Sequence, residues 1–104
     1  MTRKVYNKLV RDKIPEIIAA SGAKLKMHTL TDEEHLQALI EKLGEEYQEF
    51  KEAVNVEELA DLQEVILALA SILGSHEQLE TVRADKAAKR GAFKKKIFLE
   101  SVEE

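Results

Sequence analysis

The sequence contains no cysteine, a single proline and only four glycines among its 104 residues. Without cysteine the chain forms no disulfide framework and carries out no thiol chemistry, which fits a reducing compartment. So few prolines and glycines leave little room for a β fold with many turns. Long apolar runs are also missing, because the longest, residues 65–73, is interrupted by Ser71 and is too short to span a bilayer. We therefore expect a cytoplasmic protein.

Neither sign of charge dominates, since 16 basic residues stand against 20 acidic ones and the net charge is −4. This balance gives no sign of general nucleic-acid binding. With 44% hydrophobic and 35% charged residues, the composition is typical of a globular protein. The first residues, MTRKVYNKLVRDK, have no apolar core of signal-peptide length. The length favours one domain over residues 1–104.

Two long amphipathic helices are the strongest structural signal. In the first, residues 32–53, apolar residues recur at three- and four-residue steps, at Leu36, Leu39, Ile40, Leu43, Tyr47 and Phe50. Thr31 and Glu34 form a capping box at its start, and Asn55 breaks the helix after its end. The second helix covers residues 56–73, and its apolar stripe consists of Leu59, Leu62, Ile66, Leu69 and Leu73, widened by Val65 and Ile72.

Two shorter helices are expected on either side of this pair. The first would be capped by Asp12, carry Pro15 in its first turn and end near Gly22. Its expected buried face consists of Ile14, Ile17 and Ile18. The other would follow a capping-box candidate, Ser75–Gln78, and run to about Arg90.

Alternating polar and apolar residues predict a short strand over residues 24–30, and the tail at residues 94–102 would be a second strand beside it. The predicted fold is thus all-α, an antiparallel helical bundle of about four helices with a two-stranded β ribbon. The first helix is short and the fourth has a weak apolar face, so the two would hardly cover the wide apolar faces of the long pair. A homo-oligomer is therefore expected, with a self-sufficient four-helix monomer as the alternative.

Acidic residues border the apolar face of the first long helix. A helix turns by about 100° per residue. With Leu43 at the centre of the buried face, Glu46 lies roughly 60° and Glu49 roughly 120° to the same side. Glu45 and Glu52 point away to solvent. Glu46 and Glu49 are therefore an i, i+3 pair on the edge of the face.

The second long helix carries a matching pair. With Leu62 at the centre, Glu58 lies roughly 40° and Asp61 roughly 100° to one side. A short connection makes the two helices an antiparallel hairpin, so the two acidic pairs can face each other across the seam. Four converging carboxylates repel one another and lose solvation, and a divalent cation such as Mg²⁺, or alternatively Mn²⁺, removes that conflict. The alternative is that these are ordinary solvated helix edges paired with lysines.

Several segments resemble a known superfamily. "EEYQE" followed by "ELAD" is similar to the EExxE…ExxD signature of the all-α nucleoside triphosphate pyrophosphohydrolases, the MazG-like and phosphoribosyl-ATP pyrophosphohydrolase-like superfamily. The segments "YNKLVRDKIPEII" and "KAAKRGAFKKKIFLE" resemble a small branch of it. Together the three blocks cover most of the chain in order.

The resemblance implies an activity and a metal site. Members cleave a nucleotide between its α and β phosphates, which yields a monophosphate and pyrophosphate, and they assemble as dimers or tetramers. Mg²⁺ would be held by Glu46, Glu49, Glu58 and Asp61, the residues that helix geometry also selects. Glu45 fills the first motif position, and Glu45 or Glu49 is the candidate general base that takes a proton from water.

Two basic groups are candidates for binding the substrate phosphates. They are Lys8, Arg11 and Lys13 near the start, and Lys86, Lys89 and Arg90 near the end of the fourth helix. The spacer between the acidic motifs is short for the superfamily, which leaves the base of the nucleotide open. One alternative is hydrolysis of phosphoribosyl-ATP in histidine synthesis, and another is a helical oligomerisation or binding module without catalysis.

Overall fold

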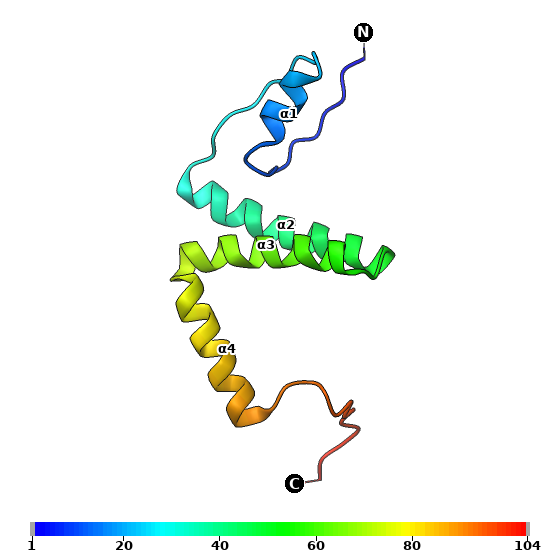
Figure 1. The fold of residues 1–104 in the computed structure, drawn as a ribbon, viewed down its shortest axis with the longest axis vertical. Helices are drawn as coiled ribbons and strands as arrows, with labels where there is room; N and C mark the ends of the chain where they lie inside the picture. The colour runs from blue at the N-terminus through cyan, green and yellow to red at the C-terminus, as the bar shows by residue number, and fades with distance from the viewer. Residues whose placement is uncertain (1, 104) are drawn as a thin grey trace.

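A computed structural model of the protein describes residues 2–103. Four helices and, over those residues, no strand make up the fold (Figure 1). The helices are α1 (Ile14–Ala20), α2 (Asp32–Glu52), α3 (Val56–Leu73) and α4 (His76–Arg90). This confirms the all-α class and the four predicted helices. None of the helices in the described part of the chain combines the length and apolarity needed to cross a bilayer.

Local side-chain caps define where α2 and α4 begin. The Thr31 hydroxyl accepts a hydrogen bond from the Glu34 backbone N–H at 3.3 Å, and the Glu34 carboxylate accepts one from the Thr31 N–H at 2.9 Å. The predicted capping box is thus present, and its backbone hydrogen bond lowers the pKa of Glu34. At the start of α4, the Ser75 hydroxyl accepts a hydrogen bond from the N–H of Gln78 at 3.0 Å.

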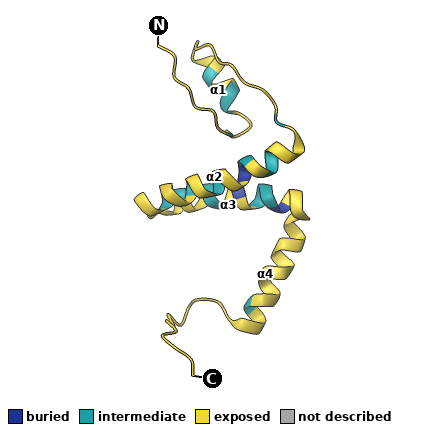
Figure 2. Ribbon diagram, turned by 180° about the vertical axis from the view of Figure 1, so that it is seen from behind, coloured by how far each residue is buried: buried dark blue, intermediate teal, exposed yellow. Residues whose placement is uncertain are grey.

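α2 and α3 lie side by side as an antiparallel hairpin (Figure 1). The buried hydrophobic residues of the described chain all belong to this pair, and they are Leu39, Val65 and Ala70 (Figure 2). α4 packs only against α3, and α1 packs against none of the other three helices. The hairpin is therefore the centre of the fold, and the remaining elements extend from it.

The corner between α3 and α4 is held by His76, the first residue of α4. Its Nε2 lies 2.9 Å from the Leu67 carbonyl oxygen and 3.0 Å from the Ser71 hydroxyl oxygen. Because a carbonyl can only accept, the contact with Leu67 requires a proton on Nε2. The imidazole thereby ties the first turn of α4 to the last turns of α3.

A single chain is much more open than a compact domain of its size. Its dimensions are 64 × 30 × 25 Å and its radius of gyration is 18.5 Å, whereas a compact chain of this length has a radius of about 13 Å. The accessible surface is 9,986 Å² for a mass of 11.8 kDa, against roughly 5,900 Å² for a folded monomer of that mass. One copy therefore leaves a large area uncovered.

The prediction for α1 was wrong in two details. The helix begins after Lys13, without a side-chain cap, so Asp12 is not the cap. A turn in which the Ile14 N–H donates to the Arg11 carbonyl oxygen at 3.1 Å leads into the helix instead. Ile17, predicted to be buried, is 61% exposed because no other helix packs against α1.

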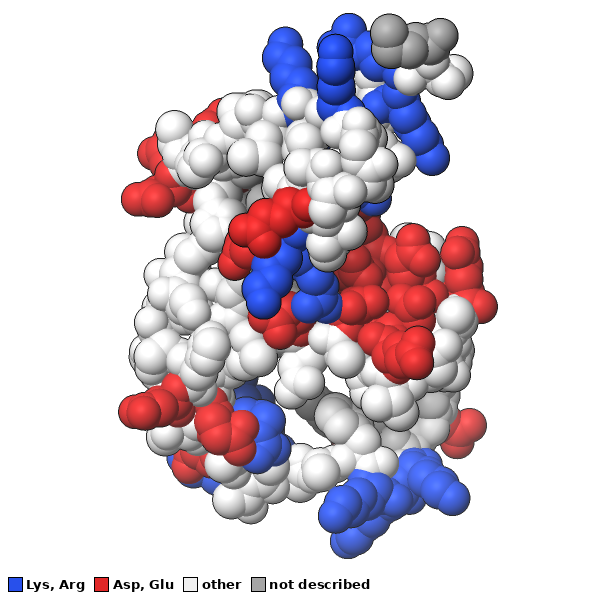
Figure 3. All heavy atoms as spheres, turned by 45° about the horizontal axis from the view of Figure 1, so that its top comes forward, with Lys and Arg blue, Asp and Glu red and all other residues white. Residues whose placement is uncertain are grey.

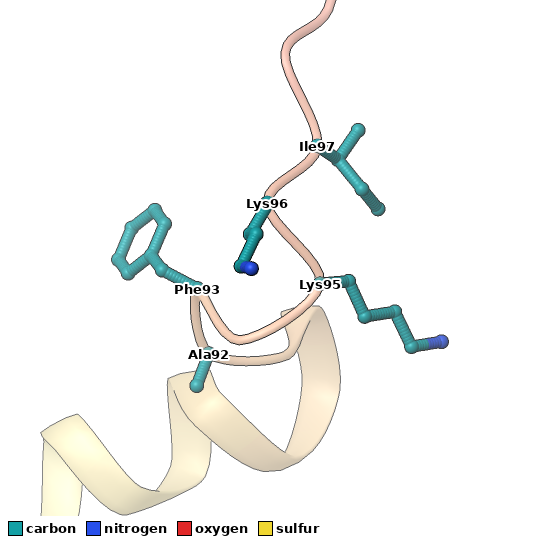
Figure 4. Close-up of a pocket in the computed structure, with 5 residues that line it drawn as sticks. All are labelled: Ala92, Phe93, Lys95, Lys96 and Ile97. Atoms are coloured by element: carbon teal, nitrogen blue, oxygen red, sulfur yellow. The ribbon is translucent and has the colours of Figure 1, made fainter.

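The predicted β ribbon is also not formed within the chain. Residues 24–30 and 94–102 lie at opposite ends of the elongated molecule, because α4 carries the tail away from the N-terminal part (Figure 1). The tail makes a local turn after α4 instead, with Lys96 at φ 60°. A shallow hollow in this turn is lined only by its own residues, Ala92, Phe93, Lys95, Lys96 and Ile97 (Figure 4).

Candidate metal centre

Three carboxylates meet where α2 faces the first turns of α3. One oxygen from each of Glu46, Glu58 and Asp61 lies within 4.8 Å of the others, and all three residues are partly buried. Glu46 comes from the C-terminal half of α2, while Glu58 and Asp61 come from the first two turns of α3. These are three of the four carboxylates that the sequence predicts to converge across the hairpin. We refer to them as the acidic cluster.

The start of α3 determines where two of these carboxylates lie. The connection from α2 consists of residues 53–55, and the side chain of Asn55 caps α3 by accepting a hydrogen bond from the Glu58 N–H at 2.9 Å. Sequence reasoning treated Asn55 only as a helix breaker. Asparagine is among the preferred N-cap residues, so the signal for this role was present in the sequence.

Glu58, a member of the acidic cluster, has a perturbed acidity. Its pKa is raised, first because partial burial disfavours its charged form. The neighbouring negative charges raise it further, in the order Asp61, Glu49, Glu46 and Glu57. Glu58 lies in the first turn of α3, where the helix dipole by itself favours a negative charge. The repulsion and desolvation predicted from helix geometry therefore outweigh the dipole.

Two basic side chains already contact the acidic cluster. Arg11, from the segment before α1, lies 2.6 Å from an oxygen of Asp61. Lys42 lies 3.5 Å from an oxygen of Glu46, one turn away on α2, and both of these side chains are mostly buried. In the described chain no lysine or arginine pairs with Glu58 in this way. Figure 3 shows acidic side chains gathered in one patch with basic side chains at its edge.

The two candidate bases are placed differently. Glu49 is exposed, but its negative charge raises the pKa of Glu58, so it lies beside the acidic cluster without joining the group of three. Glu45 is exposed and is not among the groups that shift Glu58. This placement favours Glu49 as the carboxylate that meets a bound substrate or water.

The N-terminal basic group is only partly gathered at the site. Arg11 reaches Asp61, while Lys13 is exposed at the start of α1. The ammonium of Lys8 lies 5.9 Å from the centroid of the Tyr6 ring, where it makes a cation–π contact. Of these three predicted phosphate ligands, Arg11 is the one that the fold brings into contact with the acidic cluster.

The second basic group is not brought to the acidic cluster within one chain. Lys86, Lys89 and Arg90 occupy the last turns of α4, and Lys89 pairs with Asp85 at 3.2 Å. α4 leaves the hairpin at the C-terminal end of α3, whereas the acidic cluster lies at the N-terminal end (Figure 1). A role for these residues at the same site would therefore need a second copy of the chain.

The donor set suits a hard divalent cation. Mg²⁺ prefers oxygen ligands in an octahedron and usually keeps several positions for water or substrate phosphate. Three carboxylates from two rigid helices, with oxygens within 4.8 Å, would fill part of such an octahedron and leave the rest open. Burial and the neighbouring carboxylates raise the pKa of Glu58, and a cation bound there would offset both effects.

Comparison with known proteins identifies one partial relative. No family model matches the chain, and no solved structure matches it. A stretch of 45 residues is 51% identical to part of an uncharacterized protein of Mycolicibacterium smegmatis. That stretch is 43% of this chain and 46% of the relative, so the match spans a little under half the length of each protein. No activity comes with this match, and the function has to be inferred from the site.

Proposed function

We propose that the protein is a Mg²⁺-dependent nucleotide pyrophosphohydrolase that cleaves a nucleoside triphosphate between the α and β phosphates. The observation that carries the proposal is the convergence of Glu46, Glu58 and Asp61 from two facing helices, with Arg11 beside them. Carboxylates for a hard cation and a guanidinium for phosphate are the groups that hydrolysis of a phosphoanhydride needs. The resemblance of the acidic motifs to the pyrophosphohydrolases supports the same assignment.

Each residue has a definite role in this reaction. The acidic cluster would hold the cation, which neutralises phosphate charge and lowers the pKa of a bound water. Glu49, exposed beside the cluster, takes one proton from the attacking water. Water adds across the anhydride bond, so that its oxygen joins one phosphorus and the bridging oxygen leaves with the other. The products are a nucleoside monophosphate and pyrophosphate, whose charge basic side chains stabilise.

The hairpin also supports assembly of more than one copy. Two rows of apolar side chains on it are between 41% and 75% exposed, namely Ile40 and Tyr47 on α2 and Leu59, Ile66 and Leu73 on α3. Within each row the residues are seven apart. A seven-residue apolar repeat is the pattern by which helices pack against other helices. We call these residues the apolar rows.

The apolar rows lie on one face of the hairpin. On α2, Ile40 and Tyr47 lie roughly 40–60° to one side of Leu43, and Glu46 lies on the other side. On α3 the row lies roughly 20–60° to the corresponding side of Leu62, with Glu58 on the other side. Because the helices are antiparallel, both rows face the same way. A second hairpin packed there would complete a four-helix bundle and leave the acidic cluster accessible.

The uncovered area is large enough for such an interface. The chain exposes roughly 4,000 Å² more than a folded monomer of its mass, 9,986 Å² against about 5,900 Å². Obligate homodimers bury about 2,000–5,000 Å² in total, which is roughly 1,000–2,500 Å² on each partner. We therefore include a homo-oligomer, built on the apolar rows, in the proposed function.

Pyrophosphate release with Mg²⁺ tests the activity. The substrates are a panel of nucleoside triphosphates together with phosphoribosyl-ATP, which separates the two pyrophosphohydrolase assignments. Glu49→Ala and Asp61→Ala should each lower the rate by about a hundredfold or more. Glu64→Ala removes an exposed carboxylate of α3 outside the acidic cluster and should keep the wild-type rate.

Two results would reject the proposal in different ways. A wild-type protein that releases no pyrophosphate from any substrate in the panel is not an enzyme of this class, and the non-catalytic module is then favoured. A wild-type protein that is active while both Glu49→Ala and Asp61→Ala keep the full rate has its active site elsewhere. Circular dichroism of each variant establishes that the helices remain folded.

A further inference from the structure

The contact between Arg11 and Asp61 joins two parts of the chain that otherwise touch little. Among residues 2–103, it is the one hydrogen bond or ion pair between residues 2–30 and the α2–α3 hairpin. The two residues are 50 positions apart in the sequence, and α1 packs against none of the other helices. This ion pair therefore tethers the N-terminal segment to the acidic cluster.

The acidic cluster already receives two positive charges from side chains, Arg11 on Asp61 and Lys42 on Glu46. Together they carry the charge of one divalent cation. They differ in how firmly they are held. Lys42 belongs to the same helix as its partner, and both side chains are mostly buried, whereas the side chains of Arg11 and Asp61 are 56% and 42% exposed. Arg11 is consequently the cation that a metal ion can displace at lower cost.

We infer that Arg11 occupies Asp61 in place of the divalent cation, and that metal binding releases Arg11 so that its guanidinium can bind the substrate phosphate. The inference rests on the proposed function, because it takes Asp61 to be a metal ligand. A guanidinium 2.6 Å from Oδ1 competes with a metal ion for the same carboxylate. Metal loading and phosphate capture are then coupled through one side chain, since Arg11 is free for a phosphate only when Asp61 is bound to metal.

Calorimetric titration with MnCl₂ and with MgCl₂ in the absence of nucleotide tests this competition. Removing the competitor in Arg11→Gln should tighten metal binding by about two- to fivefold, the factor that corresponds to an exposed ion pair. Arg3→Gln is the matched control, because it removes the same charge from the same exposed segment at a residue outside any ion pair of the described chain. The control should keep the wild-type affinity.

The side-chain NMR signals of Arg11 provide a second readout that does not depend on activity or on affinity. In the wild type, saturating MgCl₂ should shift the guanidinium signals of Arg11 towards those of a free arginine, while the signals of Arg3 stay unchanged. Amide hydrogen exchange in residues 8–13 should rise on adding MgCl₂ to the wild type. Arg11→Gln should show that faster exchange without metal.

The outcomes separate this inference from the proposed function. If wild type and Arg11→Gln bind metal equally well, or if Arg11→Gln binds more weakly, the displacement of Arg11 is refuted and the metal site stands. Arg11 signals that remain unchanged at metal saturation refute it as well. If neither protein binds Mn²⁺ or Mg²⁺, the metal site itself is rejected, and the proposed function and this inference both fall.

Discussion

The backbone N–H of Glu58 donates a hydrogen bond to the side-chain oxygen of Asn55 at 2.9 Å. The residue that caps α3 is thus bonded directly to a residue of the acidic cluster. The cap stabilises the start of α3 at Val56, so that Glu58 and Asp61 fall in its first two turns. The end of the short connection and the start of the site are therefore joined by one hydrogen bond.

Asn55→Ala should lower the free energy of unfolding by about 1 kcal/mol, because the first turn of α3 loses its side-chain acceptor. The melting temperature should fall by about 4–8 °C in a chain of this size. Urea unfolding at one fixed protein concentration measures the loss, and Asn55→Ser, which keeps an acceptor, should recover most of it. Equal stability of the alanine and serine variants would contradict a capping role.

Glu58→Gln should stabilise the metal-free protein at pH 7. The folded-state pKa of Glu58 is raised, which means that the folded protein favours the protonated carboxyl. The contribution of that protonated form to the free energy of unfolding is complete only below the unfolded-state pKa of about 4.3. That contribution is lost as the pH rises through the folded-state pKa, which leaves a net penalty at neutral pH. Neutral glutamine removes the penalty, and the difference in melting temperature between variant and wild type should vanish near pH 4.

The control for this prediction is Glu64→Gln, an exposed carboxylate on the same helix. It should change the melting temperature little, and by the same amount at pH 4 and pH 7. Millimolar Mg²⁺ or Mn²⁺ should raise the melting temperature of the wild type by linkage but leave Glu58→Gln nearly unchanged. A Glu58→Gln variant that is less stable than wild type at pH 7 without metal would show that repulsion in the acidic cluster is not the controlling effect.

Ile66→Lys should dissociate the proposed oligomer without unfolding the hairpin. Ile66 is 41% exposed in one copy, and a charged side chain there would be buried against the second hairpin. The dissociation constant should rise by at least about tenfold, which corresponds to about 1.4 kcal/mol. Analytical ultracentrifugation at several concentrations measures it, and Ala60→Lys, on the outer side of α3, should assemble like the wild type. A wild-type protein that is monomeric at every concentration tested would refute assembly through the apolar rows.

His76→Ala should loosen the corner between α3 and α4. The variant loses the hydrogen bonds to Leu67 and Ser71, which together contribute about 1 kcal/mol. Amide exchange in the first turns of α4 should become faster, while exchange in α2 stays unchanged. Thr81→Ala, which alters α4 away from the corner, should leave both regions as in wild type. Uniformly faster exchange throughout the chain would instead indicate general destabilisation.

Much of the helical structure was predictable because its causes are local. The bounds of α2 and α3, the Thr31–Glu34 capping box and the acidic pairs all follow from residues within a few positions of one another. The β ribbon was predicted wrongly because strand pairing requires two distant segments to meet, and residues 24–30 and 94–102 end up at opposite ends of the chain. The alternation of polar and apolar residues within one segment does not indicate which distant segment will pair with it.

The sequence by itself determined four helices, a tight α2–α3 hairpin and the presence of carboxylates on its seam, because helix periodicity and caps act over one or two turns. Only the tertiary structure decided that Glu46, Glu58 and Asp61 come within 4.8 Å of one another while Glu49 stays beside them. It also decided that Arg11, 50 residues away from Asp61, is its ionic partner. The physical reason is that the rotation of two packed helices and the path of a connecting segment depend on the whole packing, which no single stretch of residues specifies.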